Sequence, residues 1–401
     1  MIRRKSVIAI AVAAGLLAAP GAFAGQLSLD PTFSIDGKTR IDGTEPSSVT
    51  SLEKHGGKIF AAGIYLTAEF RTIFVARLSN AGELDTGYGV AGLSSVRSGA
   101  DSLYGVGLDV DDIGGVAVVG QSASRVAVAR LTSSGERDTT FSGDGVVYLR
   151  NPGTRLSFDP DVAIDSAGRL VVGTTVVRHR GFDVNLYRLL PNGDRDESFG
   201  RNGVRSFDFG ARDWMDALAV DDRDRVILGT DTESTENPNA ATRVIRLRQN
   251  GAYDPNFSED GVMRVRLRQG TVTVPVAIGV RVNGVITAAL TNGSDSYGVA
   301  RVRADGELKR SYGDNGVLGL TCDCRVLEGD IVNGRVVLAG DRGDATTLVT
   351  RIAQDGSSIS QGWLDLFPAV KNEDVQAVTF DGSQTVLGGS AFHTAYLART
   401  E

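Results

Sequence analysis

The chain has 401 residues, of which 41% are hydrophobic and 23% charged, and its formal net charge is −7. The hydrophobic content is sufficient for a folded core, and the 50 glycines indicate many turns. The negative charge, with no local basic patch, argues against nucleic acid or an anionic membrane surface as a partner.

The first 24 residues have the pattern of a secretory signal peptide. A basic head at residues 3–5 precedes a short apolar run at residues 7–19 and a small-x-small site that ends at Ala24. The run is too short to span a membrane, and no second apolar segment of about 18 residues follows. We therefore expect cleavage after Ala24, export to the periplasm or beyond the cell, and a mature chain, residues 25–401, that is not embedded in a membrane.

The mature sequence repeats a motif in which an aromatic residue is followed four residues later by glycine. Successive aromatic residues lie 53 to 58 residues apart. The copies are Phe33/Gly37, Tyr88/Gly92, Phe141/Gly145, Phe199/Gly203, Phe257/Gly261 and Tyr312/Gly316. We expect a degenerate seventh copy at Trp363, where the glycine is absent. A fixed period of this length indicates a repeat architecture.

A second mark has the same period, and it consists of a short apolar run that ends in arginine. The arginines are Arg77, Arg130, Arg188, Arg246, Arg301, Arg351 and Arg399. Between the two marks, each unit contains two apolar runs separated by an Asp- or Gly-bearing turn, for example residues 162–172. Such runs are typical of strand–turn–strand structure and are too short for amphipathic helices.

The pattern of each unit therefore predicts four strands, and the presence of seven such units predicts an all-β chain. We expect residues 25–401 to form one domain, a seven-bladed β-propeller of four-stranded blades. The chain begins with a strand at residues 38–41 and ends with the arginine-marked strand at residues 395–399. We expect the first strand to pair with the last one and close the final blade, which removes exposed sheet edges.

The aromatic-glycine segments resemble a known repeat. Residues 29–37, 137–145 and 253–261, which read LDPTFSIDG, RDTTFSGDG and YDPNFSEDG, are similar to the delta-60 repeat of bacterial exported and surface proteins. The resemblance covers nearly all of the mature chain and implies a propeller-like fold, but it brings no settled activity. Lys309 and Ser360 replace the aspartate of this motif in the sixth and seventh copies.

Residues that recur in every unit predict structural roles. The Asp-Gly and Asn-Gly pairs supply the positive-φ positions of tight turns. A buried guanidinium requires partners, and we expect the repeated arginines to bind the motif aspartates or backbone carbonyls. The candidate aspartates are Asp30, Asp85, Asp138, Asp196 and Asp254. An arginine ring that faces a ligand is the less favoured alternative.

We find no motif for catalysis, a metal or a cofactor. The three histidines have no paired spacing. Cys322 and Cys324 form either a strained disulfide or two thiols. The acidic groups around Asp109 and Asp221 are expected to be solvated turn residues, although carboxylates could also serve a glycosidase or hold a cation.

The connections between the second and third strands vary among the units, and in a propeller they share one face with the loops that enter each inner strand. Variable loops on a rigid scaffold are where recognition usually occurs. The candidate binding residues on this face are Tyr65, Arg71, Arg178, His179, Arg212, Asp213, Trp214, Asp231, Tyr297 and Arg342.

The leading functional hypothesis is a secreted or cell-surface, monomeric scaffold that binds a protein or a glycan without catalysing a reaction. The alternative is an exported carbohydrate-active or other hydrolytic enzyme, in which acids such as Asp101, Asp213 or Asp295 would converge within about 10 Å. A third hypothesis is a structural module stabilised by a cation.

Overall fold

The computed structural model describes most of residues 25–401. The described residues are 25–41, 47–66, 71–97, 103–122, 125–150, 160–178, 181–210, 212–233, 242–267, 273–343, 346–368 and 374–401. Residues 1–24, which the sequence predicts to be a signal peptide, lie outside them, as do Asp101 and His179. All regular secondary structure in these ranges is β-strand. Within the same ranges, no helix has the length and hydrophobicity that a membrane crossing requires.

Three sets of strands in the first half of the chain follow the predicted four-strand pattern. One sheet contains β3 (Ser47–His55), β4 (Lys58–Leu66), β5 (Arg71–Ser79) and β6 (Leu93–Val96). The next contains β7 (Tyr104–Val110), β8 (Val116–Gln121), β9 (Arg125–Leu131) and β10 (Val146–Arg150). A third set contains β11 (Asp161–Ile164), β12 (Leu170–Arg178), β13 (Gly181–Leu189) and β14 (Val204–Phe207).

The third set continues into the fourth through one parallel bridge between Phe182 and Arg212. The fourth set contains β15 (Arg212–Val220), β16 (Val226–Glu233), β17 (Thr242–Leu247) and β18 (Val262–Val265). The following sheet contains β19 (Val274–Val280), β20 (Ile286–Thr291), β21 (Ser296–Val302) and β22 (Val317–Thr321). The bridge thus joins two four-strand sets into one hydrogen-bonded sheet.

The last two sheets include strands from the beginning of the chain. One contains β23 (Arg325–Val332), β24 (Arg335–Asp341), β25 (Thr347–Ile352) and β26 (Ile359–Leu364), with β1 (Gly25–Gln26) added at the edge. The other contains β27 (Asp374–Asp381), β28 (Gln384–Ala391), β29 (Thr394–Thr400) and β2 (Lys38–Ile41). Strand β2 runs antiparallel to β29, with Lys38 opposite Ala398 and Ile41 opposite Ala395. The predicted pairing of residues 38–41 with residues 395–399 is confirmed.

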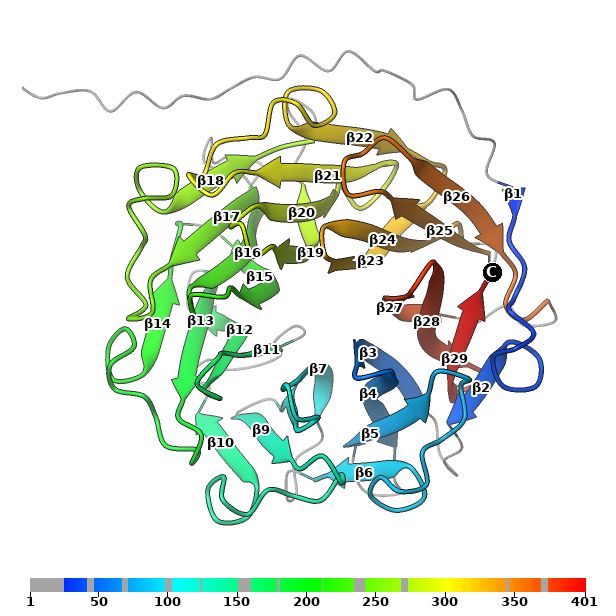
Figure 1. The fold of residues 1–401 in the computed structure, drawn as a ribbon. Helices are drawn as coiled ribbons and strands as arrows, with labels where there is room; N and C mark the ends of the chain where they lie inside the picture. Colours follow the sequence, from blue (N-terminus) through cyan, green and yellow to red (C-terminus); the bar gives the residue numbers. More distant parts are fainter. Residues whose placement is uncertain are drawn as a thin grey trace, which may run out of the picture.

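The sheets stand side by side around a central axis (Figure 1). The first strand of each set lies nearest the axis, and each of these inner strands contacts the inner strand of the next sheet. The inner strands are β3, β7, β11, β15, β19, β23 and β27. Hydrophobic clusters fill the space between neighbouring sheets, as where Phe60 and Ile73 pack with Val106 and Val118. The alternating apolar residues of each strand therefore serve two interfaces.

Repeated arginines bind motif aspartates and backbone carbonyls, as the sequence predicted, and these contacts join neighbouring sheets. Arg246 binds Asp254 at 2.8 Å, donates to the carbonyl of Ala304 in the next sheet at 2.6 Å, and lies over the ring of Phe257. Equivalent ion pairs are Arg77–Asp85, Arg130–Asp138, Arg188–Asp196 and Arg399–Asp30. One guanidinium thus binds the motif aspartate of its own unit and a backbone carbonyl of the following unit. This contact explains why the arginine and the aromatic-glycine motif recur with the same period.

Two copies of the motif differ from the pattern. Arg301, which faces no motif aspartate, lies over the ring of Tyr312 and donates to the carbonyl of Gln354 at 2.6 Å. The expectation of a degenerate motif aromatic at Trp363 was wrong. The other motif aromatics are buried in turns, whereas Trp363 lies within strand β26 and only partly packs against the core. The sequence between Ile352 and Ile359 is too short for the complete turn.

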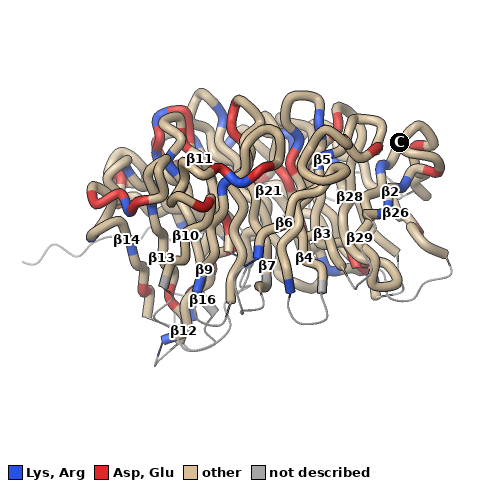
Figure 2. Tube along the Cα trace, turned by 90° about the horizontal axis from the view of Figure 1, so that it is seen from below, with Lys and Arg blue, Asp and Glu red and all other residues tan. Residues whose placement is uncertain are grey.

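The two edges of the disc have different connections. Because neighbouring strands are antiparallel, the Asp/Gly turns and the aromatic-glycine turns lie on one edge, which we call the turn face. Figure 2 shows many charged residues of these turns along its upper edge. The connections between second and third strands, and those that enter each inner strand, lie on the opposite edge, which we call the loop face.

Candidate functional site

The described candidate residues all lie at strand ends on the loop face. Tyr65 and Arg71 flank the β4–β5 connection, Arg178 ends β12, and Arg212 begins β15. The structure does not gather them into one site, because they are distributed over several sheets around the disc. Four of them come together where the third and fourth strand sets meet, and these are Arg178, Arg212, Asp213 and Trp214.

An aromatic pair forms the outer part of this meeting point. The rings of Phe182 and Trp214 lie 4.5 Å apart between centroids, and both side chains are partly exposed. The guanidinium of Arg212, which is exposed, lies 5.7 Å from the centroid of Phe182. The parallel bridge between Phe182 and Arg212 holds the two strands in this register. The result is a surface with an apolar ring face beside a cation.

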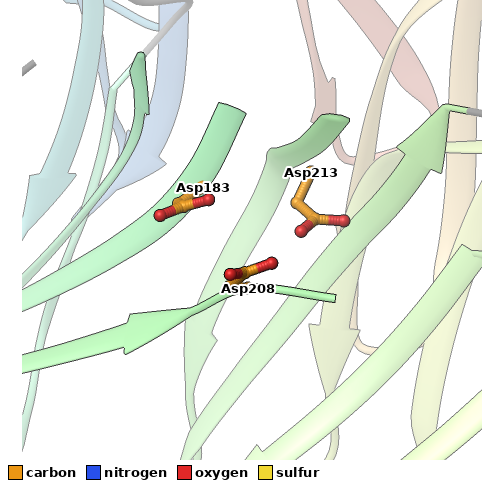
Figure 3. Close-up of side chains that lie close together, drawn as sticks. All are labelled: Asp183, Asp208 and Asp213. Atoms are coloured by element: carbon orange, nitrogen blue, oxygen red, sulfur yellow. The ribbon is translucent and has the colours of Figure 1, made fainter. Parts of the chain in front are cut away.

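Three carboxylates lie next to this pair. Oxygen atoms of Asp183, Asp208 and Asp213 all lie within 4.8 Å of one another (Figure 3). Asp183 lies near the start of β13, Asp208 follows β14, and Asp213 lies near the start of β15. We call the whole surface the β13–β15 corner, and it consists of Arg178, Phe182, Asp183, Asp208, Arg212, Asp213 and Trp214.

Hydrogen bonds fix the carboxylate of Asp213 at the base of the corner. Asp213 is fully buried, and it accepts hydrogen bonds from the backbone N–H of Phe209 at 2.6 Å and from the hydroxyl of Thr232 at 2.7 Å. Asp208 is exposed and accepts from the N–H of Gly210 at 2.8 Å. The base of the corner is therefore rigid, while one carboxylate faces solvent.

The electrostatics of the corner show competing effects. Burial raises the pKa of Asp213 above its ordinary value, although its hydrogen bonds with Phe209 and Thr232 oppose the shift. Burial also raises the pKa of Asp183, and the charge of Asp208 adds to this, while Arg178 at 3.2 Å opposes it. Clustered carboxylates of this spacing can ligate a divalent cation or share a proton. Here nearby arginine already neutralises part of the charge.

The remaining candidate side chains lie apart from the corner or point inward. Tyr297 is buried at 1% exposure, and its hydroxyl lies 3.1 Å from that of Thr350, so its ring belongs to the core and offers no binding surface. Tyr65 stacks on Phe74, and Arg342 lies 4.4 Å from the ring centroid of Trp363. Arg342 is exposed and follows the end of β24, as predicted. Tyr65 and Tyr297, which were expected in exposed loops, lie within β4 and β21, because these strands extend further than the sequence indicated.

Asp231 is also buried, and it contacts another carboxyl group. It lies opposite Trp214 across the β15–β16 pair, and its side chain forms a hydrogen bond with Asp216. Burial and the neighbouring Asp231 raise the pKa of Asp216 well above the ordinary range. One proton shared between these carboxyl groups accounts for their coexistence in the interior.

A second group of carboxyls lies on the inner strands, and we call it the inner carboxyls: Glu53, Asp109, Asp161 and Asp330. Each carboxyl accepts a hydrogen bond from a backbone N–H of the next inner strand. Asp109 accepts from Ile164 at 2.6 Å, and Asp161 accepts from Leu218. Glu53 and Asp330 accept in the same way from Val110 and Phe380. These contacts join inner strands that have no backbone ladder between them.

The inner carboxyls are held in an environment that disfavours their charge. Burial raises the pKa of Glu53, and the charge of Asp109, to which it is hydrogen-bonded, raises it further. Burial likewise raises the pKa of Asp330 and Asp109. The pKa of Asp161 rises to about 7. Glu53 therefore keeps a proton that it donates to Asp109.

Sequence reasoning missed most of these groups. It placed Asp109 in a solvated turn, whereas Asp109 lies in β7 and its carboxyl faces neighbouring inner strands. The expectation of turn chemistry is confirmed for Asp221, which accepts from the N–H groups of Arg223 and Arg225, but Asp221 is buried rather than solvated. The signal for Asp109 was an acid between Leu108 and Val110 in an apolar run. Glu53, Asp109 and Asp330 share one register, since the second-strand residues opposite them, Phe60, Ala117 and Val337, each pair with the repeated arginine of their unit. Asp161 lies at a different point of its strand, opposite Gly173, and the remaining units have no acid at the shared position.

The two cysteines form a disulfide. Cys322 and Cys324 are bonded across a bend that follows β22, with their Cα atoms 5.2 Å apart. The sequence left a disulfide and free thiols as alternatives, and the structure has the disulfide. The bend provides the separation that a straight strand would not.

Comparisons with known proteins agree with the observed architecture. Residues 112–141 match the family described as "Domain of unknown function (DUF5122) beta-propeller". A polysaccharide lyase, Uly1, is similar in structure with a TM-score of 0.53 at 9% identity, over 94% of this chain and 96% of that one. The chain folds as a β-propeller.

Other similar structures are more distant. Raptor from Chaetomium thermophilum gives a TM-score of 0.49 at 11% identity, over 91% of this chain and 29% of that one. A protein of unknown function from Bacteroides caccae gives 0.38 at 10% identity, over 69% and 82% of the two chains. No curated protein matches this sequence. At 9% identity, the similarity to the polysaccharide lyase concerns the fold alone.

Proposed function

We propose that this protein is an exported, closed seven-bladed β-propeller that binds a glycan through the β13–β15 corner without catalysing a reaction. Strands β3 to β26 divide into six consecutive sets of four, and β2 with β27–β29 supplies a seventh. The contact between each inner strand and the next, and the β2–β29 pairing, support a closed ring. We assign the repeat to the delta-60 type on its motif.

The aromatic pair beside charged groups is the observation that carries the binding proposal. Phe182 and Trp214 present partly exposed ring faces, against which the C–H face of a sugar can pack. Arg212 and Asp208 are exposed next to them, and these groups can donate to and accept from hydroxyls. A small number of placed polar groups around apolar rings is typical of ligand sites. A protein ligand would be the other outcome of the test below.

Export is supported by two features of the chain. The first 24 residues have the signal-peptide pattern, and Cys322 and Cys324 are bonded as a disulfide. Disulfides persist mainly in oxidising compartments, which include the periplasm and the cell exterior. We propose one of these locations for the mature protein, which we expect to be a monomer.

A glycan array, with a pull-down from cell-surface proteins in parallel, tests the binding proposal. We expect the mature protein to bind a defined set of glycans, and Trp214→Ala to weaken that binding by at least about tenfold, since buried aromatic anchors dominate binding energy. Trp214→Phe, which keeps a ring against Phe182, should retain most of the affinity. Melting temperatures of both variants separate lost binding from lost folding.

Tyr148→Ala is the matched control. Tyr148 is an exposed aromatic residue on the outer strand β10, with Arg125 at 5.9 Å from its ring, and it lies outside the corner. Its removal should leave glycan binding unchanged. Binding that is equal in the Trp214→Ala variant and the native protein would place the ligand elsewhere, and recovery of protein ligands alone would replace the glycan by a protein.

A hydrolytic or other carbohydrate-active enzyme is the second candidate, and Glu53 and Asp109 are the observation that favours it. A protonated carboxyl hydrogen-bonded to a second one is the arrangement from which a general acid and a base are built. Asp109, however, also accepts from backbone N–H groups at 2.6 and 2.8 Å, which fits a structural role better. The enzyme would be favoured if the native protein forms products from polysaccharides and if Glu53→Gln abolishes this activity but still binds the polysaccharide.

A further inference from the structure

A pocket of about 320 Å³ lies on the turn face, opposite to the face that holds the β13–β15 corner. Its walls are turns of two neighbouring sheets. The β15–β16 turn contributes Arg223 and Arg225, and the β19–β20 turn contributes Val282 and Asn283. This volume is at the lower end of the range of small-molecule sites, about 300–1,000 Å³, and suits a ligand the size of one sugar ring.

The floor of the pocket consists of arginines that are already neutralised. Arg225 binds Asp221 at 2.6 Å and Asp254 at 3.4 Å, and Arg246 binds Asp254 at 2.8 Å. Arg223 differs, because it is exposed and its guanidinium has no ion-pair partner among the residues that the structure describes. Arg223 is therefore the arginine of the pocket without an ion-pair partner among the described residues, and it lies beside the paired Arg225 and Arg246.

The acidic residues near Arg223 do not neutralise its positive charge. Asp305 lines the pocket, but its carboxylate is bound by Arg303 at 2.5 Å. Asp224 belongs to the same turn as Arg223, yet it points toward the preceding sheet, where it accepts from the N–H of Ser166 at 3.0 Å. An anionic group in the pocket would thus meet Arg223, while the carboxylate of Asp305 in the lining is paired with Arg303.

The other lining groups suit hydroxyls and a C–H surface. Asn256 and Asn283 both line the pocket, and an amide side chain can donate and accept hydrogen bonds. The oxygen of Asn283 accepts from the N–H of Val285 at 3.2 Å, which leaves its NH₂ group to donate. Val282 is 83% exposed and provides an apolar wall. A sugar ring carries both kinds of surface.

We propose that this pocket binds a carboxylate-bearing sugar, a uronate, with its carboxylate on Arg223. The planar fork of a guanidinium matches a carboxylate in a bidentate pair, and this gives specificity over neutral sugars. The hydroxyls of the sugar face the two asparagines, and the ring packs against Val282. The proposal is independent of the corner, since the two sites lie on opposite faces and share no residue.

Titration calorimetry with glucuronate, galacturonate and glucose tests this proposal on the mature protein. We expect both uronates to bind, with dissociation constants of about 1 mM for a single ring, and glucose to bind at least about tenfold more weakly. Arg223→Ala should weaken uronate binding by about tenfold or more, because it removes a charge-assisted hydrogen bond. The uronate affinity of Arg223→Lys should lie between those of the native protein and Arg223→Ala, because lysine keeps the positive charge but lacks the planar guanidinium.

Arg137→Ala is the control for a general loss of positive charge, since Arg137 is also an exposed arginine in a turn on the same face. It should leave uronate binding unchanged, and none of the variants should shift the melting temperature. Equal affinity for glucose and glucuronate, no uronate binding at all, or an unchanged affinity in Arg223→Ala would overturn the proposal. Tighter binding of a sulfated sugar than of either uronate would replace the carboxylate by a sulfate group. Trp214→Ala should have no effect here, which separates this site from the corner.

Discussion

Replacing Arg246 with alanine should lower the free energy of unfolding by about 3–5 kcal/mol, the range found when one partner of a buried ion pair is removed. Arg246 and Asp254 are exposed by only 2% and 3%. Without the guanidinium, Asp254 loses its 2.8 Å partner and the carbonyl of Ala304 loses its donor. The ring of Phe257 also loses its contact. Urea denaturation, followed by tryptophan fluorescence and circular dichroism, measures the change.

Arg248→Ala is the matched control for this experiment. Arg248 lies two residues further along the chain and approaches the same Asp254 at 4.0 Å, but its side chain is 50% exposed. An exposed pair of this kind contributes about 0–1 kcal/mol, so the control should be close to the native protein. Similar losses in both variants would contradict the view that the repeated arginines hold adjacent sheets together through buried contacts.

Asp161→Asn should make the protein more stable at pH 8 than the native protein, by as much as about 4 kcal/mol, and should have little effect near pH 4. The pKa of Asp161 is about 7 in the folded chain against an ordinary value of 3.8. Between these values the folded state holds a proton that the unfolded state has released, so stability falls as pH rises. Each pKa unit corresponds to about 1.4 kcal/mol.

This prediction is tested by comparing the unfolding free energies of Asp161→Asn and the native protein at pH 4, 6 and 8. Asparagine cannot ionise, so its advantage should grow with pH and level off above pH 7. Asp222→Asn, which removes an exposed aspartate from the β15–β16 turn, controls for the loss of one negative charge. A difference between Asp161→Asn and the native protein that is the same at all three pH values would show that the charge of Asp161 is not the cause.

The parts of the structure that recur could be predicted from the sequence, because repetition exposes them. The pairing of Arg188 with Asp196, for example, follows from two residues that keep the same spacing in several units. The pairing of β2 with β29 also followed, since the chain starts with one surplus strand. Such features need only local spacing and the requirement that buried polar groups have partners.

The parts that bring different units together could not be predicted. Asp183 and Asp208 join Asp213 in the corner through the paths of three separate strands, and no local pattern relates them. Asp213 itself was expected at an exposed loop, but the extended start of β15 buries it. The inner carboxyls are similar, because each one bonds to a backbone N–H of the next inner strand, and such a contact between units has no local pattern in the sequence. Geometry between units, rather than residue type, determines these sites.

The pairing of Lys38–Ile41 with the final strand has a consequence for biosynthesis. The first of these strands leaves the ribosome about 350 residues before its partner, so the last sheet cannot assemble until synthesis is complete. During that time β2 has an unpaired edge, and such an edge can capture the matching strand of another copy. A protein that lacks β29 (Thr394–Thr400) and Glu401 should therefore form exchanged dimers or aggregates rather than a shorter monomer.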